Sequence, residues 1–158
     1  DAAETYRDVL AIFRDEFGND NFYIAGILQS YAGVYLRMEE YEQAESIIRE
    51  SLEHSERLLP PGHLRQAYPL KGLADALRGQ DRFSEALPYA EKAYHIRSES
   101  LEEDDPNLMS ARYTLGLCLW NLNRRDEAET HLRESLAFFE TNSARFQSQL
   151  EELRSIGF

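Results

Sequence analysis

The fold is decided by the stretch AESIIRESL, residues 44–52, because a close copy, AETHLRESL, returns at residues 128–136. A third copy, ALPYAEKAY, starts midway between them at Ala86, so the three alanines are spaced by 42 residues. Ala2 continues the same spacing toward the N-terminus and starts a more diverged copy. Self-similarity at a fixed period of this length is typical of repeat proteins.

A second set of small residues keeps the same period. Ala32, Ala74 and Gly116 each lie twelve residues before one of these alanines. Apolar residues surround them at spacings of three and four, which places each set on one helical face. Two antiparallel helices approach closely where their side chains are small. The pattern therefore predicts helical hairpins that must stack on one another to bury their apolar faces.

These residues resemble the tetratricopeptide repeat. The pattern of that family places a large residue, a leucine and a small residue in the first helix and an alanine in the second. The third copy supplies Arg112, Leu115, Gly116 and Leu119, followed by Ala128 and Leu132. A period of 42 residues is similar to that of kinesin light chain repeats. The resemblance implies an all-α fold, an antiparallel helix-hairpin array wound as a right-handed superhelix.

The repeat boundaries divide the predicted single domain into five segments. A half repeat containing only a second helix covers residues 1–20, and three repeats follow at 21–60, 61–102 and 103–141. Residues 142–158 break the pattern and contain Phe146, Leu150 and Leu153, which predicts a C-terminal capping helix. Because the chain begins at Asp1 rather than Met, we expect it to be a piece of a longer protein.

The family resemblance also implies a concave groove lined by the first helix of each repeat, which holds a peptide or a partner protein. Transferring the register predicts groove residues on all three repeats: Gln29 and Arg37; Tyr68, Lys71, Asp75 and Arg78; Tyr113, Trp120 and Asn121. Positive side chains beside aromatic ones favour an acidic partner with apolar anchors. The alternative is a solvated inner face without a ligand.

Composition narrows the partners and activities that this chain can have. A net charge of −12 disfavours nucleic acid and anionic membranes as partners, since both require a concentrated positive surface. The single cysteine, Cys118, lies among leucines and is expected to pack as a small hydrophobe rather than act as a nucleophile. The four histidines show no metal-ligand spacing. We therefore expect no enzyme activity, no cofactor and no metal, and a cytoplasmic location.

The predicted function is a scaffold or regulatory module for protein–protein interaction. One alternative is the regulatory region of a larger multidomain enzyme or transcription regulator, such as a bacterial signalling kinase, whose active part lies elsewhere. Self-association through the terminal helices is a further possibility.

Overall fold

The chain is described by a computed structural model that covers residues 2–19 and 21–158. Over these residues it forms eight α-helices and no strand. The helices are α1 (Ala2–Phe17), α2 (Phe22–Arg37), α3 (Tyr41–Leu58), α4 (Ala67–Gly79), α5 (Phe83–Ser100), α6 (Pro106–Asn121), α7 (Arg125–Thr141) and α8 (Gln147–Ser155). A short 3₁₀ turn, η1 (Leu64–Gln66), leads into α4. The predicted all-α class is confirmed.

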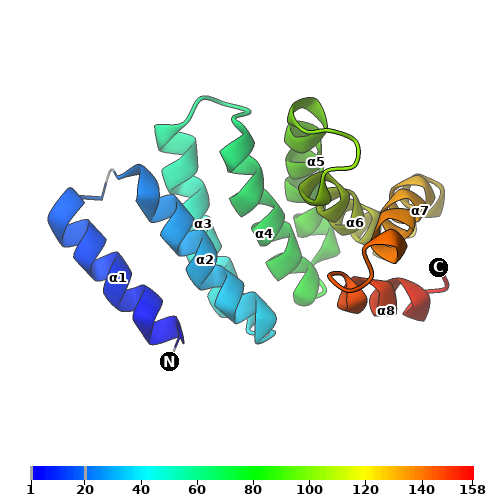
Figure 1. Cartoon of the computed structure of the whole chain (residues 1–158), viewed down its shortest axis with the longest axis horizontal. Coiled ribbons are helices and arrows are strands. Elements are labelled where there is room, and N and C mark those ends of the chain that lie inside the picture. Colours follow the sequence, from blue (N-terminus) through cyan, green and yellow to red (C-terminus); the bar gives the residue numbers. More distant parts are fainter. Residues whose placement is uncertain (1, 20) are drawn as a thin grey trace.

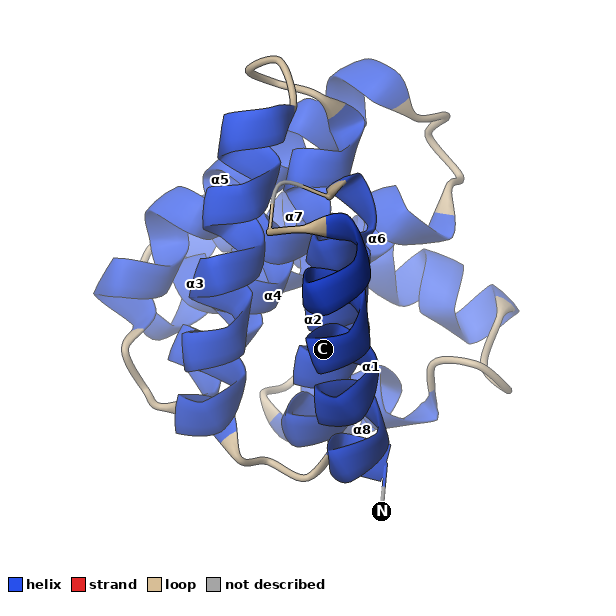
Figure 2. Ribbon diagram, turned by 90° about the vertical axis from the view of Figure 1, so that its left-hand side faces the viewer, coloured by secondary structure: helices blue, strands red, loops and turns tan. Residues whose placement is uncertain are grey.

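The helices pair as three hairpins, α2 with α3, α4 with α5 and α6 with α7, and α1 precedes them at the end of the array (Figure 1). Figure 2 shows α3 and α5 on one side of the array and α2 and α6 on the other. The backbones of successive first helices lie close together, α2 with α4 and α4 with α6, whereas the backbones of the described second helices do not. The array therefore curves, with the first helices on its inner side.

Small residues bring the two helices of each hairpin together. Ala44, Ala86 and Ala128 are completely buried. At Gly116, an added Cβ atom would lie only 2.6 Å from Leu132 Cδ2, so α6 and α7 need a glycine at this contact. The hydroxyl of Ser51 donates a hydrogen bond to the Ala25 carbonyl at 2.9 Å. Small side chains thus let the two backbones approach, and the Ser51 hydroxyl links one helix to the other.

The turn within each hairpin also repeats. Glu39, Asp81 and Asn123, which are 42 residues apart, adopt left-handed φ angles of 60°, 58° and 61°. The residue after each donates its backbone N–H to a carbonyl five residues earlier, as in the Schellman motif that ends many helices. This motif reverses the chain with only a few residues and keeps the hairpins alike.

Helix starts follow the expected chemistry with one exception. The Asp105 side chain accepts a hydrogen bond from the Asn107 N–H, and Pro106 occupies the first turn of α6. Pro69 also lies in a first turn, because α4 begins at Ala67. Pro88 is the exception: it lies inside α5, where it leaves the Ser84 carbonyl without its helical donor.

The C-terminal segment packs against the end of the array, but its direction differs from that of a further first helix. Phe146, Leu150 and Leu153 are buried in the main core beside α7. A regular next first helix would lie alongside α6, yet the backbone of α8 contacts only α7 among the described helices. In Figure 1, α8 runs across the lower end of the neighbouring helices. This direction carries Glu152 to the inner side of the array.

None of the helices in residues 2–19 and 21–158 has the length and hydropathy that crossing a membrane requires.

Candidate functional site

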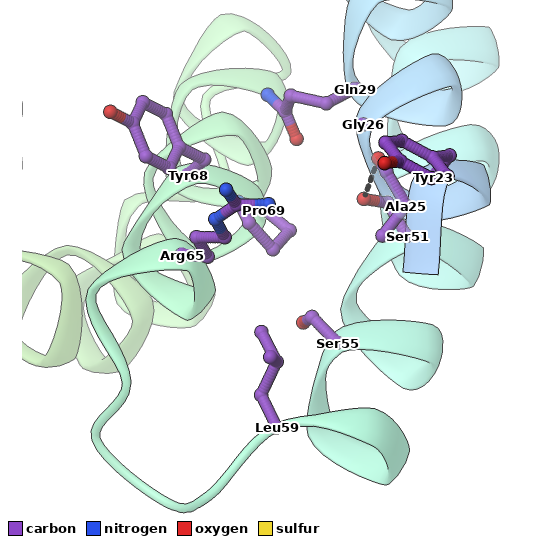
Figure 3. A pocket seen from close by; sticks show the side chains of 10 residues that line it. All are labelled: Tyr23, Ala25, Gly26, Gln29, Ser51, Ser55, Leu59, Arg65, Tyr68 and Pro69. Atoms are coloured by element: carbon purple, nitrogen blue, oxygen red, sulfur yellow. Dashed lines mark hydrogen bonds between the residues drawn. The ribbon is translucent and has the colours of Figure 1, made fainter. Parts of the chain in front are cut away.

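One cavity lies between the α2–α3 hairpin and the start of α4. It has a volume of about 410 Å³. Figure 3 shows side chains entering it from α2, from α3 and from the segment that leads into α4. Ten residues line it: Tyr23, Ala25, Gly26, Gln29, Ser51, Ser55, Leu59, Arg65, Tyr68 and Pro69. We call this hollow the α2–α4 cavity.

Two tyrosines and a glutamine provide the groups of the α2–α4 cavity that a ligand could contact. Tyr23 and Tyr68 are 65% and 41% exposed, which is high for aromatic residues. Gln29 extends from α2 toward α4 (Figure 3). Its Oε1 atom is buried and has no hydrogen-bond donor among the described residues. A buried carbonyl without a donor costs free energy, and a ligand N–H would remove that cost.

A buried arginine, Arg97, packs against the Tyr68 ring. The Arg97 guanidinium lies 5.1 Å from the ring centre, within the range of a cation–π contact. Arg97 is only 3% exposed and donates a hydrogen bond to the Asn107 carbonyl at 2.7 Å. Burial lowers the pKa of Arg97, and the nearby Tyr68 opposes this shift. The arginine therefore holds one face of Tyr68 and leaves the rest of the ring accessible.

A second cavity, of about 220 Å³, lies between α4, α6 and α8. Four of the predicted groove residues line it: Lys71, Asp75, Arg78 and Tyr113. Lys71 forms an ion pair with Asp75 one helical turn away. Thr114 donates a hydrogen bond to the other Asp75 oxygen at 2.8 Å. We call this hollow the α4–α8 cavity.

The C-terminal helix supplies the acidic partner of the α4–α8 cavity. Glu152 accepts a hydrogen bond from Arg78 at 2.6 Å and another from the Tyr113 hydroxyl. Burial raises the pKa of Tyr113, and the hydrogen bond to Glu152 adds to the shift, so the phenol stays protonated and donates. Burial opposes ionisation of Asp75, but Lys71 and Arg78 outweigh it and lower its pKa. The positive charge of this region is thus compensated within the chain.

The remaining predicted groove residues lie elsewhere. Trp120 lines a third cavity, where the Arg125 guanidinium is 3.6 Å from its ring centre and Phe158 packs edge-on against it. The Asn121 side chain donates to the Leu117 carbonyl in its own helix. Neither Arg37 nor Asn121 lines any of these three cavities. The other predicted groove residues therefore lie in three places. Gln29 and Tyr68 line the α2–α4 cavity, the four residues named above line the α4–α8 cavity, and Trp120 lines the third.

Tyr23, Arg65 and Glu152 line these cavities although the repeat pattern does not predict them. Tyr23 and Arg65 precede the part of each first helix that the repeat pattern covers. Glu152 lies in a segment without a sister copy, so no register pointed to it. Its only sequence signal is its position two residues after Leu150, on a short helix with apolar residues on its other side.

Cys118 is completely buried, and burial raises the pKa of its thiol to about 12. A thiol in this state carries negligible thiolate at neutral pH, in agreement with its expected packing role. Over residues 2–19 and 21–158, no cluster of three or more histidine, cysteine or carboxylate side chains has the geometry of a metal site.

The chain was compared with known proteins. The model of the tetratricopeptide repeat matches residues 23–99 and 82–141. No curated protein sequence matches. A solved Podosopora anserina structure of kinesin light chain-type, nearly identical TPR-like repeats aligns with 98% of this chain and 84% of its own, at 17% identity and a TM-score of 0.76.

Two further solved structures are similar. A TPR-like protein of Chlorobium tepidum is 26% identical, over 85% of this chain and 95% of its own, with a TM-score of 0.68. The TPR domain of Arabidopsis FLU is 22% identical, over 74% of this chain and 95% of its own, with a TM-score of 0.61. Family match, helical hairpins and period agree: the chain belongs to the tetratricopeptide repeat family, which generally serves as a scaffold for protein–protein interaction.

Proposed function

We propose that this protein binds a segment of a partner protein in the α2–α4 cavity. The observation that carries the proposal is the buried Gln29 Oε1 atom without a donor, in a hollow flanked by the exposed rings of Tyr23 and Tyr68. A polypeptide supplies what these groups lack, because its backbone N–H can donate to Gln29 and an apolar side chain can pack between the tyrosines.

The volume and charge of the cavity narrow the chemistry of the segment. About 410 Å³ accommodates a few side chains and is too small for a folded domain. Arg65 contributes positive charge to its wall. An acidic segment with one apolar or aromatic anchor fits this arrangement. The anchor enters the cavity, and a carboxylate lies toward Arg65.

The α4–α8 cavity has a different role in this proposal. Glu152 already satisfies Arg78 and Tyr113, so an acidic partner reaches these groups only by replacing Glu152. Displacing α8 would also expose Leu150 and Leu153, which are at most 1% exposed. Exposing two leucines costs on the order of 3–6 kcal/mol. The partner therefore contacts Gln29 and Tyr68, while Arg78 and Tyr113 remain bonded to Glu152.

A peptide-display selection against the full chain, followed by titration of the selected peptides by calorimetry, tests the proposal. Tyr68→Ala and Gln29→Ala should each weaken binding by roughly tenfold, since each removes one anchor or one hydrogen bond from a small contact. Gln43→Ala on α3 and His95→Ala on α5 are matched controls on exposed second-helix positions. They should bind like the wild type.

The selection also distinguishes the two cavities. Glu152→Gln should leave binding in the α2–α4 cavity unchanged. If the Tyr68 and Gln29 variants bind normally and Glu152→Gln strengthens binding, the partner lies in the α4–α8 cavity and the proposal is wrong. If no peptide is enriched over a library of acidic and apolar sequences, the α2–α4 cavity is not a peptide site.

A further inference from the structure

The repeat allows the two contacts between successive first helices to be compared position by position. In the α4–α6 contact, Thr114 of α6 is completely buried, and its hydroxyl donates a hydrogen bond to Asp75 of α4 at 2.8 Å. Lys71, one turn before Asp75 on α4, forms an ion pair with the other oxygen of the same carboxylate. Both oxygens of this acceptor therefore have a donor within the chain.

The α2–α4 contact lacks these side chains. At the positions 42 residues earlier, two glycines, Gly33 and Gly72, replace the aspartate and the threonine, and Gln29 replaces the lysine. The Gln29 Oε1 atom is buried, and residues 2–19 and 21–158 provide no donor for it. The hydroxyl that serves as a donor in the next contact is missing here because residue 72 is a glycine.

Helix packing does not require a glycine at residue 72. A Cβ atom added to Gly72 would lie 3.0 Å from Gln29 Nε2 and 3.3 Å from Ile48 Cδ1, so these side-chain ends need to move by only a few tenths of an ångström. At Gly116, by contrast, the nearest atom would lie at 2.6 Å. A glycine inside a helix lowers the stability of that helix. Gly72 is therefore better explained by the space and the acceptor that it leaves open.

We infer that Gly72 determines the specificity of the α2–α4 cavity, because it leaves the Gln29 carbonyl to a donor from the partner. This inference rests on the proposed function and adds which backbone group the partner segment presents. Gln29 extends from α2 toward α4 at the cavity (Figure 3), and Gly72 lies against its amide nitrogen. A hydroxyl at residue 72 would satisfy the amide within the chain and remove this contact from the site.

The partner segment therefore needs a backbone N–H that is not already bonded. N–H groups in the interior of an α-helix donate to carbonyls four residues earlier, and proline has no N–H. An extended segment, or the first turn of a helix, presents a free N–H group. This group lies close to the apolar anchor, since Gln29 and Tyr68 line the same cavity. The cavity thus selects against the interior of a helix and against proline at this position.

Amide-to-ester substitution in the bound peptide tests the inference, because each ester replaces one backbone N–H with an oxygen atom and keeps the side chains. The probe is the tightest peptide from the display selection, titrated into the full chain by calorimetry. One ester should weaken binding to the wild type by roughly five- to tenfold. Gln29→Met keeps the length of the side chain without its carbonyl. The same ester should change binding to this variant by less than about twofold.

Two substitutions at Gly72 separate the effect of a hydroxyl from the effect of added volume. Gly72→Ser brings a donor to the Gln29 amide, whereas Gly72→Ala adds the same Cβ atom without a donor. The ester should weaken binding to Gly72→Ala by about the same factor as binding to the wild type. It should change binding to Gly72→Ser by less than about twofold. Each result is a ratio of two peptides on one protein, so a general loss of affinity does not produce it.

Three results would overturn the inference and leave the proposed function standing. One is a selected peptide for which no ester effect depends on Gln29. Another is an ester effect that persists in Gly72→Ser, because the hydroxyl then does not replace the donor of the partner. The third is a Gly72→Ser variant that circular dichroism shows to be unfolded, since the glycine then serves packing. If no peptide is selected at all, the proposed function is wrong as well.

Discussion

Replacing Gly116 with alanine should destabilise the protein, because the α6–α7 contact has no room for a methyl group. An added Cβ atom would lie 2.6 Å from Leu132 Cδ2 and 2.8 Å from Leu132 Cγ. Ordinary contacts between carbon atoms are about 3.5–4.0 Å. Leu132 is completely buried and cannot turn toward solvent. Overpacking of this kind costs about 1–3 kcal/mol of the free energy of unfolding.

The second hairpin indicates how the loss can be compensated. It carries Ala74 and Ala90 where the third carries Gly116 and Leu132, and both alanines are at most 1% exposed. Leu132→Ala alone should cost about 2–5 kcal/mol, because it leaves a cavity. In the double variant the new methyl group fills part of that cavity. The double variant should therefore be more stable, by about 1–2 kcal/mol, than the sum of the single changes implies.

Urea denaturation followed by circular dichroism measures all four proteins of this cycle. Gly26→Ala is the matched control, since no atom lies within 4 Å of the position of its added Cβ. It should stabilise α2 by about 0.5–1 kcal/mol, the helix propensity difference between the two residues. A Gly116→Ala variant within about 0.5 kcal/mol of the wild type, or strictly additive single changes, would refute the close-contact reasoning.

Three other substitutions have predicted effects on the stability of the protein. Pro88→Ala should raise the free energy of unfolding by about 1–3 kcal/mol, since it restores an N–H to the Ser84 carbonyl at an exposed position of α5; thermal melting checks this. Glu39→Gly should stabilise the first hairpin by about 1 kcal/mol, because φ is 60° there and glycine adopts this angle without strain; a result at or below wild-type stability in urea would contradict it. Asp75→Asn should destabilise the protein at neutral pH. The pKa of Asp75 is lowered in the folded state, so its contribution is complete above its ordinary pKa of 3.8 and is lost as the pH falls through the lowered value. The stability difference between wild type and Asp75→Asn should therefore shrink on acidification below about pH 4, and a difference that stays constant to pH 2 would exclude an ionised Asp75 as its cause.

The helical hairpins, and the small residues that let them close, could be predicted from the sequence. Each hairpin contact joins residues that are near in sequence, and three copies repeat it with a period of 42. The burial of Cys118 also followed from Leu115, three residues earlier, since residues at this spacing share one helical face. Local and repeated signals of this kind do not require knowledge of how distant elements meet.

The grouping of the candidate site residues depended on the tertiary structure. Register placed Lys71, Arg78, Tyr113 and Trp120 on equivalent faces of the first helices, but the folded chain divides them between two cavities, with Trp120 in one and the other three in the other. The direction of α8 has no sister copy that could predict it, and it decides that Glu152 meets Arg78, 74 residues away in the chain. Long-range packing of one unrepeated helix thus determined which charges are compensated and which cavity stays open, whereas the repeat itself was determined by local sequence.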